Sequence, residues 1–213
     1  DEMIIREVWA PGGDTYGVSP NGRYLNYIDW TAIELAVKDL ETGKSWNITS
    51  RGTWNDPVQF PDISIWSPDG KQLAYYWFNG ESTEIWIANF DGTEDRLVVS
   101  DVKLPWIIDW SPDGKHLLAI NNVSDPEKPL GHHDQLVLIS VVDGSLSILK
   151  SFDELHTCHM KFSPDGKYIA IDVGHCQQGE NGDIYLLALD GSSEGWLVTD
   201  PANDREAMWS PDG

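Results

Sequence analysis

The chain is poor in basic residues, in cysteine and in long apolar runs. Its 213 residues contain 14 Lys and Arg against 35 Asp and Glu, so the formal net charge is −21. Binding to nucleic acid by neutralising phosphates needs a basic surface, and the charge balance excludes that class of function. No apolar run approaches the ~20 residues that cross a bilayer, so we expect no membrane span.

The composition nevertheless supports a folded core, since 40% of the residues are hydrophobic and 11 are Trp. Two cysteines are too few for a disulfide scaffold. The first residues are neither an initiator Met nor a basic signal peptide, and we expect a processed or excised piece. Glycosylation sequons at Asn47 and Asn122 favour an exported protein, periplasmic or extracellular.

One tetrapeptide recurs along the whole chain. Ser-Pro-Asp-Gly occupies 67–70, 111–114, 163–166 and 210–213, and a copy with Asn in place of Asp occupies 19–22. The serines at 19, 67, 111, 163 and 210 are separated by 48, 44, 52 and 47 residues, the length of one four-stranded propeller blade. Pro, Asp and Gly suit the successive positions of a tight turn, so each copy predicts a hairpin corner.

Apolar strands flank each of these corners, and a second turn with Gly joins a third and a fourth strand later in each repeat. Thr31–Leu40 contains helix formers, but it occupies the third-strand position and we predict a strand there. The sequence therefore predicts an all-β propeller of four-stranded antiparallel blades in a single domain, 1–213. The expected blades are approximately 15–50, 59–100, 104–152 and 156–200, with partial blades at 3–9 and 204–213.

The pattern apolar-Trp-Ser-Pro-Asp-Gly-Lys-x-Leu/Ile-Ala, followed later by apolar-Asp-Gly, resembles the TolB-like, WD-repeat-like β-propeller family over essentially the whole chain. The resemblance implies a relation to periplasmic partner-binding propellers and to the propeller domains of prolyl-oligopeptidase-type hydrolases. Since the last copy stops at Gly213, we expect a fragment of a ring of six to eight blades, with the remaining blades beyond Gly213. The motif residues build turns, so they indicate a fold and not a function.

The two ends of each expected blade differ. The repeated Gly turns lie at one end, and connections of irregular length lie at the other, where binding is expected. These connections are 50–59, 79–82, 121–134, 151–155, 174–181 and 200–204.

The aromatic residues fall into two groups, those at a shared position in every repeat and those outside it. Those that share one repeat position should pack between blades: Trp66, Trp110, Phe162 and Trp209. The aromatic candidates for the binding face occupy no shared repeat position, and they could stack on a sugar ring or anchor a peptide. They are Trp54, Phe60, Trp77, Phe78 and Trp106. His132 and His133, in one long loop, are further candidates for this face.

A second group of chemistry-bearing residues comprises His156, Cys158, His175 and Cys176. If the corner at Ser163 sets the register, residue n pairs with about 330 minus n, which puts His156 opposite Gly174 and Cys158 opposite Asp172. Three interpretations stay open: ordinary packing and loop roles, a disulfide between the two cysteines, and a site for Zn or another transition metal. No cofactor is otherwise expected.

Catalytic signatures are missing from the sequence, which contains no Gly-x-Ser-x-Gly, His-Glu-x-x-His, Walker loop or dinucleotide glycine motif. First-strand carboxylates such as Asp109 are expected to line the channel, with Lys161 as one possible partner. We therefore expect no catalytic residue within the chain, and a module that binds a protein or peptide through its variable loops. The alternatives are a propeller that gates or positions substrate for a peptidase, hydrolase or polysaccharide-acting enzyme, and a structural or filament-forming surface protein.

Overall fold

The structure, a computed structural model, describes residues 15–102, 105–127, 132–152, 156–174, 182–199, 201–210 and 212–213. The predicted partial blade 3–9 lies outside these residues. Sixteen strands and no helix occur in the described part of the chain, so none of its elements is a helix that could cross a membrane. The chain divides between Asp101 and Val102 into two compact units, and each unit is described separately below.

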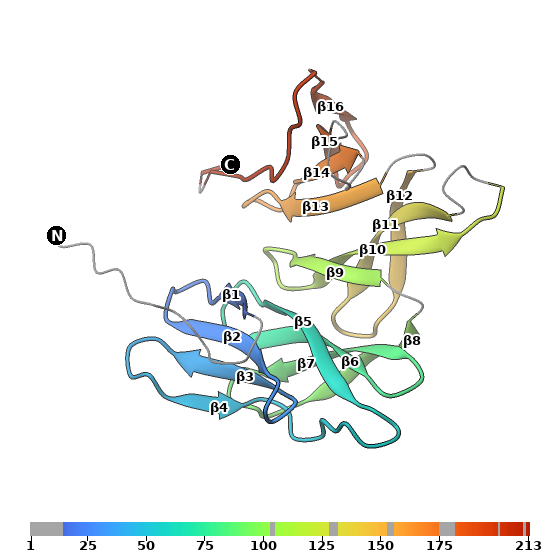
Figure 1. Ribbon diagram of the computed structural model, residues 1–213. Coiled ribbons are helices and arrows are strands. Elements are labelled where there is room, and N and C mark those ends of the chain that lie inside the picture. The colour runs from blue at the N-terminus through green and yellow to red at the C-terminus, as the bar shows by residue number, and fades with distance from the viewer. Residues whose placement is uncertain are drawn as a thin grey trace. The chain divides into compact units, whose positions relative to one another are not determined.

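The first unit contains two four-stranded antiparallel sheets (Figure 1). The strands of the first sheet are β1 (Thr15–Val18), β2 (Tyr24–Asp29), β3 (Glu34–Asp39) and β4 (Ser45–Asn47). Those of the second sheet are β5 (Phe60–Trp66), β6 (Gln72–Phe78), β7 (Thr83–Asn89) and β8 (Arg96–Val102). In each sheet the strands follow one another in chain order, and β5 packs against β1, β2 and β3 of the preceding sheet.

The second unit repeats this arrangement. Its first sheet comprises β9 (Pro105–Trp110), β10 (His116–Ser124), β11 (His132–Ser140) and β12 (Leu146–Phe152). Its second sheet comprises β13 (His156–Phe162), β14 (Tyr168–Gly174), β15 (Gly182–Ala188) and β16 (Glu194–Val198). The strand β13 packs against β9 and β11.

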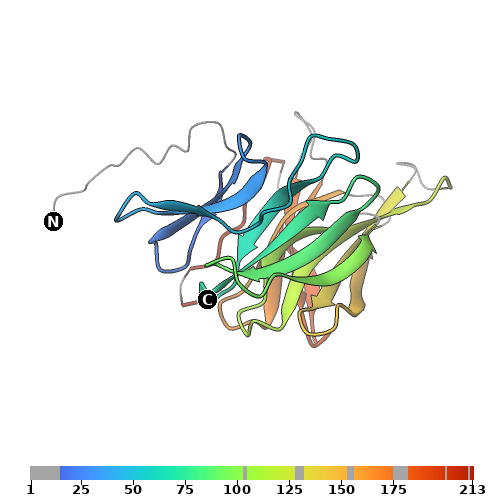
Figure 2. The ribbon, with the colours of Figure 1, turned by 90° about the horizontal axis from the view of Figure 1, so that it is seen from below.

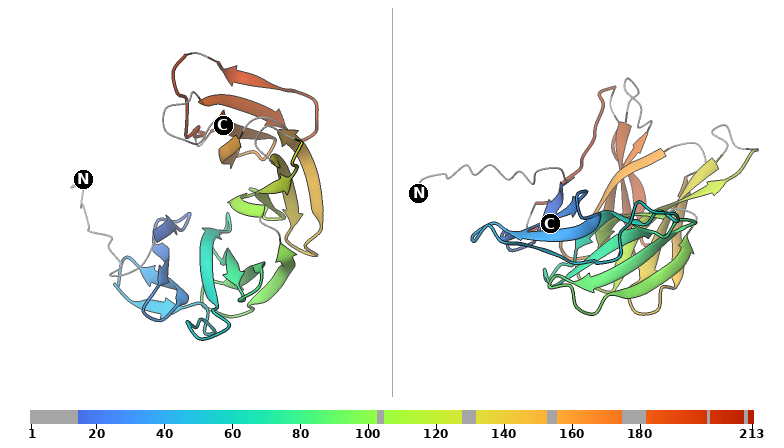
Figure 3. Two further views of the ribbon diagram at one scale, coloured as in Figure 1. Left: turned by 45° about the vertical axis from the view of Figure 1, so that its right-hand side comes forward. Right: turned by 60° about the horizontal axis from the view of Figure 1, so that its bottom comes forward.

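Four antiparallel meanders of four strands confirm the predicted all-β propeller fold. The strand predicted within Thr31–Leu40 is also confirmed, because β3 occupies Glu34–Asp39. Figure 2 shows the twist of one of these sheets, formed by the cyan-to-green strands β5 to β8. Figure 3 shows from two further sides how the strands of each sheet run side by side.

The Ser-Pro-Asp-Gly corners at 67–70, 111–114 and 163–166 use the same hydrogen bonds. At the second copy, Ser67 Oγ donates to Asp69 Oδ1 at 2.7 Å, and Gly70 N donates to the Ser67 carbonyl at 2.9 Å. Gly70 has a φ of +68°, a conformation that side chains with a Cβ rarely adopt. Because these bonds lie within the tetrapeptide, the motif alone specifies the hairpin.

The first strands carry a recurring irregularity that the sequence pattern does not reveal. The antiparallel register shifts within each first-to-second strand pair, as at Ile63, which lies between the paired residues Asp62 and Ser64. Ile63 has a φ of +28°, and Glu206, also four residues before a repeat serine, has a φ of +56°. Such bulges bend a strand and redirect its side chains, so the first strand of each blade does not pair regularly with the second along its whole length.

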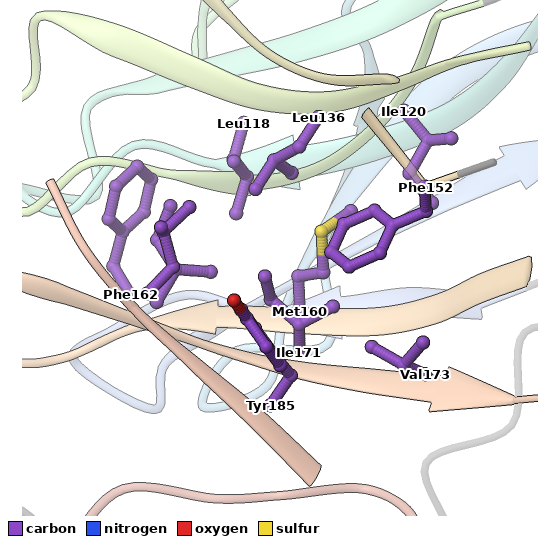
Figure 4. Close-up of a cluster of buried hydrophobic side chains, with 11 residues drawn as sticks. Leu118, Ile120, Leu136, Phe152, Met160, Phe162, Ile171, Val173 and Tyr185 are labelled. Atoms are coloured by element: carbon purple, nitrogen blue, oxygen red, sulfur yellow. The ribbon is translucent and has the colours of Figure 1, made fainter. Parts of the chain in front are cut away.

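The core of each unit lies between its two sheets. In the second unit the buried cluster joins β10, β11 and β12 to β13, β14 and β15. Figure 4 shows the Met160 side chain directed toward the Phe152 ring within this cluster. The corresponding cluster of the first unit contains Leu35, Tyr75 and Trp77, with Trp66 packed against it.

The aromatic residues at the shared repeat position lie in or against these contacts. Trp110 and Phe162 are buried, and Trp66 and Trp209 are half-buried.

The segment 201–210 runs beside the last sheet without forming a strand. Asp204 N donates to the Gly182 carbonyl at 2.8 Å, and Trp209 Nε1 donates to the Lys161 carbonyl at 3.0 Å. The buried Asp172 carboxylate accepts from the backbone of Glu206 and Ala207. These contacts attach the segment to the blade formed by β13 to β16.

Candidate functional site

Four aromatic side chains gather in the first unit, at the end of the blades that carries the irregular connections. We call them the aromatic cluster: Trp30, Trp54, Phe60 and Phe78. The indoles of Trp30 and Trp54 stack with centroids 6.0 Å apart and an interplanar angle of 19°. Phe60 lies 6.0 Å from each of these indoles and 5.2 Å from Phe78.

The members of the aromatic cluster come from four separate segments of the first unit. Trp30 follows β2, Trp54 lies in the connection from β4 to β5, and Phe60 pairs directly with Phe78 across β5 and β6. Trp54 is 57% exposed, whereas the other three rings are half-buried. The cluster therefore presents one indole to solvent on a base of three supporting rings.

The loop that carries Trp54 is held at its neck. Thr53 and Gln59 form an isolated β-bridge, with N to O distances of 2.7 and 2.8 Å. Thr53 Oγ1 accepts from Asn55 N at 3.0 Å. A Cβ placed on Gly80, in the β6–β7 turn, would lie 2.5 Å from Pro57, so the loop packs closely on that turn. Trp54 thus projects from a small closed hairpin.

A buried carboxylate fixes the start of the same loop. Glu34 is 6% exposed, and it accepts hydrogen bonds from Thr49 Oγ1 and from Gly52 N, the latter at 2.8 Å. Thr49 Oγ1 in turn accepts from Leu35 N at 3.0 Å. A Cβ on Gly52 would lie 1.8 Å from the Ile33 carbonyl oxygen, which leaves room for glycine alone.

Arg51 connects this loop to the next blade. Its guanidinium carbon lies 4.2 Å from the centroid of the Trp77 ring and 4.0 Å from that of Trp86. The guanidinium also forms an ion pair with Asp95 and donates to Tyr75 Oη at 3.0 Å. Burial and the hydrogen bond to Asp95 raise the pKa of Tyr75 well above its usual range, so this hydroxyl remains a donor. The five residues form one contact between adjacent blades.

This contact decides the role of one predicted binding residue. Trp77 is 1% exposed and packs beneath Arg51 in the core, so it does not belong to the exposed surface. Its position on a central strand, where both faces are covered, explains the burial. Trp54, Phe60 and Phe78 do come together, and Trp30 joins them.

The expected loop 121–134 is for the most part a hairpin arm, which corrects the predicted loop bounds. The strands β10 and β11 continue pairing to Ser124 and His132, so the ladder includes His133 opposite Val123. His133 Nδ1 lies 3.9 Å from Asp125 Oδ2. The side chain of His132 lies outside the described part of the structure. Trp106, on β9 in the second unit, is 45% exposed.

Two members of the predicted His and Cys group, His175 and Cys176, lie outside the described residues. His156 pairs with Gly174, which confirms the expected register at that position. Cys158 does not pair with Asp172 as expected, because the register shifts between Thr157 and Met160. Nothing in the structure tests a disulfide or a metal ion at these residues.

Among the described residues no three His, Cys, Asp or Glu side chains converge as metal ligands. Lys161, named above as a possible partner of the first-strand carboxylates, forms an ion pair with Asp109 at 3.0 Å, and Asp109 also accepts from Phe162 N. This carboxylate therefore connects β9 to β13, and it serves the packing of adjacent blades.

The fold and the aromatic cluster define a β-propeller with a preorganised aromatic surface. No family model and no curated protein matches the chain. Solved structures do match it. The structure of putative TolB from Agrobacterium tumefaciens has a TM-score of 0.69 and 21% identity, over 98% of this chain and 70% of that one.

Two further structures extend the comparison. TolB from Acinetobacter baumannii has a TM-score of 0.58 at 20% identity, over 88% of this chain and 43% of that one. An oligogalacturonate lyase in complex with manganese has a TM-score of 0.63 at 17% identity, over 89% of this chain and 55% of that one. At these identities the likeness establishes the propeller fold. The chain spans about half the length of the last two proteins.

Two residues that build the site, Arg51 and Glu34, carried no recognisable signal in the sequence. Arg51 lies in an irregular connection and Glu34 begins β3, and the residues that they contact are distant in the chain. Trp30 was detectable in principle, because it follows β2 at the same end as Trp54.

Proposed function

We propose that the chain is a non-catalytic β-propeller module of an exported protein, and that it binds a protein or peptide through the aromatic cluster and its surrounding loops. The observation that supports this proposal best is Trp54, an indole 57% exposed on a closed hairpin. Exposed aromatic side chains on a rigid support are typical binding hot spots, because little conformational entropy is lost on association.

Export is part of the proposal. It is supported by the acidic composition, by the sequon at Asn47, whose side chain is exposed, and by the resemblance to partner-binding propellers. We propose either a periplasmic or an extracellular location.

The test of the proposal is a pull-down from the native source with Trp54→Ala and a control, Val142→Ala. Val142 is 84% exposed in the β11–β12 turn, at the end of its blade that carries the Gly turns. We expect Trp54→Ala to lose captured partner and Val142→Ala to retain it, with both variants melting near the wild-type temperature. If only the Val142 variant loses the partner, binding occurs at the other end of the blades and the proposal is wrong.

A second candidate is a propeller that positions substrate for an enzyme whose catalytic part lies outside this chain. It is supported by the likeness of the fold to an oligogalacturonate lyase and to a prolyl endopeptidase, the latter with a TM-score of 0.62 at 15% identity. Any sequence found beyond Gly213 in the natural protein would separate the two candidates. Further repeats alone would favour the binding module, whereas a Gly-x-Ser-x-Gly segment would favour a peptidase.

A further inference from the structure

The exposed indole of Trp54 lies among loops that are acidic. The three loops at this end of the first unit are 29–33, 50–59 and 79–82, and they carry the carboxylates Asp29, Asp56 and Glu81. Asp56 and Glu81 are exposed. Arg51 is the only basic residue in these loops, and it already forms an ion pair with Asp95. The net charge of −21 extends the same sign over the chain, so an anionic ligand would be repelled.

The chain itself shows how it accommodates a cation on an aromatic ring. Arg51 lies between two indoles and pairs with a carboxylate. Lys150 Nζ lies 5.0 Å from the Tyr185 ring centroid and 2.8 Å from Glu194. Arg23 lies 5.2 Å from the Tyr24 centroid and 2.9 Å from Asp39. In all three places one cation contacts a π-face and a carboxylate together, so the ring and the carboxylate both attract it.

Trp54 has the ring and the nearby carboxylate but lacks the cation. In the part of the chain that the structure describes, its ring contacts are the neighbouring Trp30 and Phe60 rings, with no Lys or Arg over it. Asp56 follows it by two residues in the same closed hairpin. Indole is the best aromatic partner for a cation, and Arg also stacks on it through its planar guanidinium.

We propose that the aromatic cluster receives a guanidinium or ammonium side chain of a basic peptide segment, which stacks on Trp54 while Asp56 and Glu81 attract its charge. This proposal rests on the proposed function and names the chemistry of the partner. A neutral sugar would use the indole face without the carboxylates, and it is treated as an outcome of the test.

The experiment is a calorimetric titration with oligo-arginine, oligo-lysine and oligo-glutamate peptides at physiological ionic strength, where charges beyond about 8 Å are screened. A neutral oligosaccharide serves as a further probe. We expect the two cationic peptides to bind, oligo-arginine more tightly, and the other two probes not to bind. Trp54→Ala and Trp54→Leu should each weaken oligo-arginine binding on the order of tenfold, since both remove the π-face and keep every charge.

Two matched controls separate this site from general attraction to an acidic protein. Trp196→Ala removes an indole that is 47% exposed on β16 and should leave the affinity unchanged. Asp56→Asn should weaken binding more than Glu41→Gln, which removes an exposed carboxylate at the opposite end of the first blade. Equal effects of the Trp54 and Trp196 variants, or none from Trp54→Leu, would mean charge alone attracts the peptide and would overturn the proposal.

The remaining outcomes distinguish this proposal from the broader one. Binding of the neutral oligosaccharide in place of the cationic peptides would assign the surface to sugar and overturn both proposals. If Trp54→Ala loses the native partner in the pull-down while no cationic peptide binds, the partner-binding function stands and the basic-peptide proposal fails.

Discussion

Replacement of Arg51 tests whether the contact between the first two blades depends on a planar cation. Arg51→Met keeps an unbranched stem of similar length and removes the guanidinium. Arg51→Lys keeps the charge and loses the flat surface that lies between Trp77 and Trp86. A comparison of the two variants therefore separates stacking from charge.

The expected magnitude follows from the contacts of Arg51. Each cation–π contact at a partly exposed site contributes about 0.5–1 kcal/mol. The ion pair with Asp95 adds at most about 1 kcal/mol, because both side chains keep some exposure to solvent, at 31% and 21%. We expect Arg51→Met to lower the free energy of unfolding by about 1–3 kcal/mol, and Arg51→Lys by about 1–2 kcal/mol, since the ammonium retains the pairing with Asp95.

Thermal unfolding followed by circular dichroism measures these changes. For a chain of this size each kcal/mol shifts the melting temperature by about 2–4 °C, so Arg51→Met should melt about 2–12 °C lower. Near-ultraviolet dichroism should lose intensity as well, because the two indoles lose their common partner. Lys44→Met serves as the control, since it removes an exposed charge from the β3–β4 turn.

Two results would refute the reasoning. If Arg51→Lys were as stable as the wild type, charge would account for the contact and the stacked geometry would contribute nothing. If Arg51→Met were no less stable than Lys44→Met, the interaction between the blades would not depend on Arg51.

Three further predictions concern the turns and the loop neck. Gly52→Ala should lower the free energy of unfolding by about 2 kcal/mol or more in urea titrations, because the new Cβ would lie 1.8 Å from the Ile33 carbonyl oxygen. Gly195→Ala is the control. It has no atom within 4 Å of the added Cβ, and it should leave the free energy of unfolding unchanged. Asn21→Asp should change stability by less than about 0.5 kcal/mol, since Asn21 Oδ1 already accepts the hydrogen bonds that Asp accepts in the other copies; a larger loss would show that its amide group is needed. Hydrogen bonding to Lys167 lowers the pKa of Asp165 from 3.8 to about 2. The stabilising contribution of Asp165 is therefore complete above pH 3.8 and is lost as the pH falls through about 2. A carboxyl NMR titration measures this pKa, and a value near 3.8 would contradict the prediction.

The sequence predicted the blades because the signals for them are local. A Ser-Pro-Asp-Gly corner closes its hydrogen bonds within four residues, and the strands on either side are apolar on both faces. The third strand at Glu34–Asp39 was predicted from its place in the repeat, although the segment contains helix-forming residues. Where the period is strong, repeat position predicts structure better than propensity does.

The parts that could not be predicted depend on contacts between distant residues. Arg51 meets Asp95 across 44 positions, and the carboxylate of Glu34 meets Gly52 across 18. Trp77 and Trp54 are both tryptophans outside the shared repeat position, yet one is 1% exposed and the other 57%. Neither follows the repeat position, but Trp77 lies in the apolar strand β6, whose faces are both covered, whereas Trp54 lies in the polar loop that joins β4 to β5.

The first repeat shows how a departure from the pattern is absorbed. In the other complete repeats the corner Asp pairs with the Lys two residues later, as Asp69 does with Lys71 at 3.4 Å. In the first repeat the corner residue is Asn21, which has no charge to offer Arg23. Arg23 instead pairs with Asp39 of the second turn at 2.9 Å, and it lowers the pKa of that carboxyl well below its usual range. The change in pairing partner leaves the corner's hydrogen bonds intact.

The aromatic cluster differs from such a compensated change. Its residues follow no repeat position, and the loop that carries Trp54 is held by Glu34, Gly52 and Arg51, which also lie outside the repeat. A loop needed only to connect β4 to β5 would not require a buried carboxylate, a glycine that no other residue can replace, and a stacked arginine. Rigid support for an exposed indole is the expected arrangement where a side chain must be presented to a partner, since the ordering cost is met during folding and not on binding.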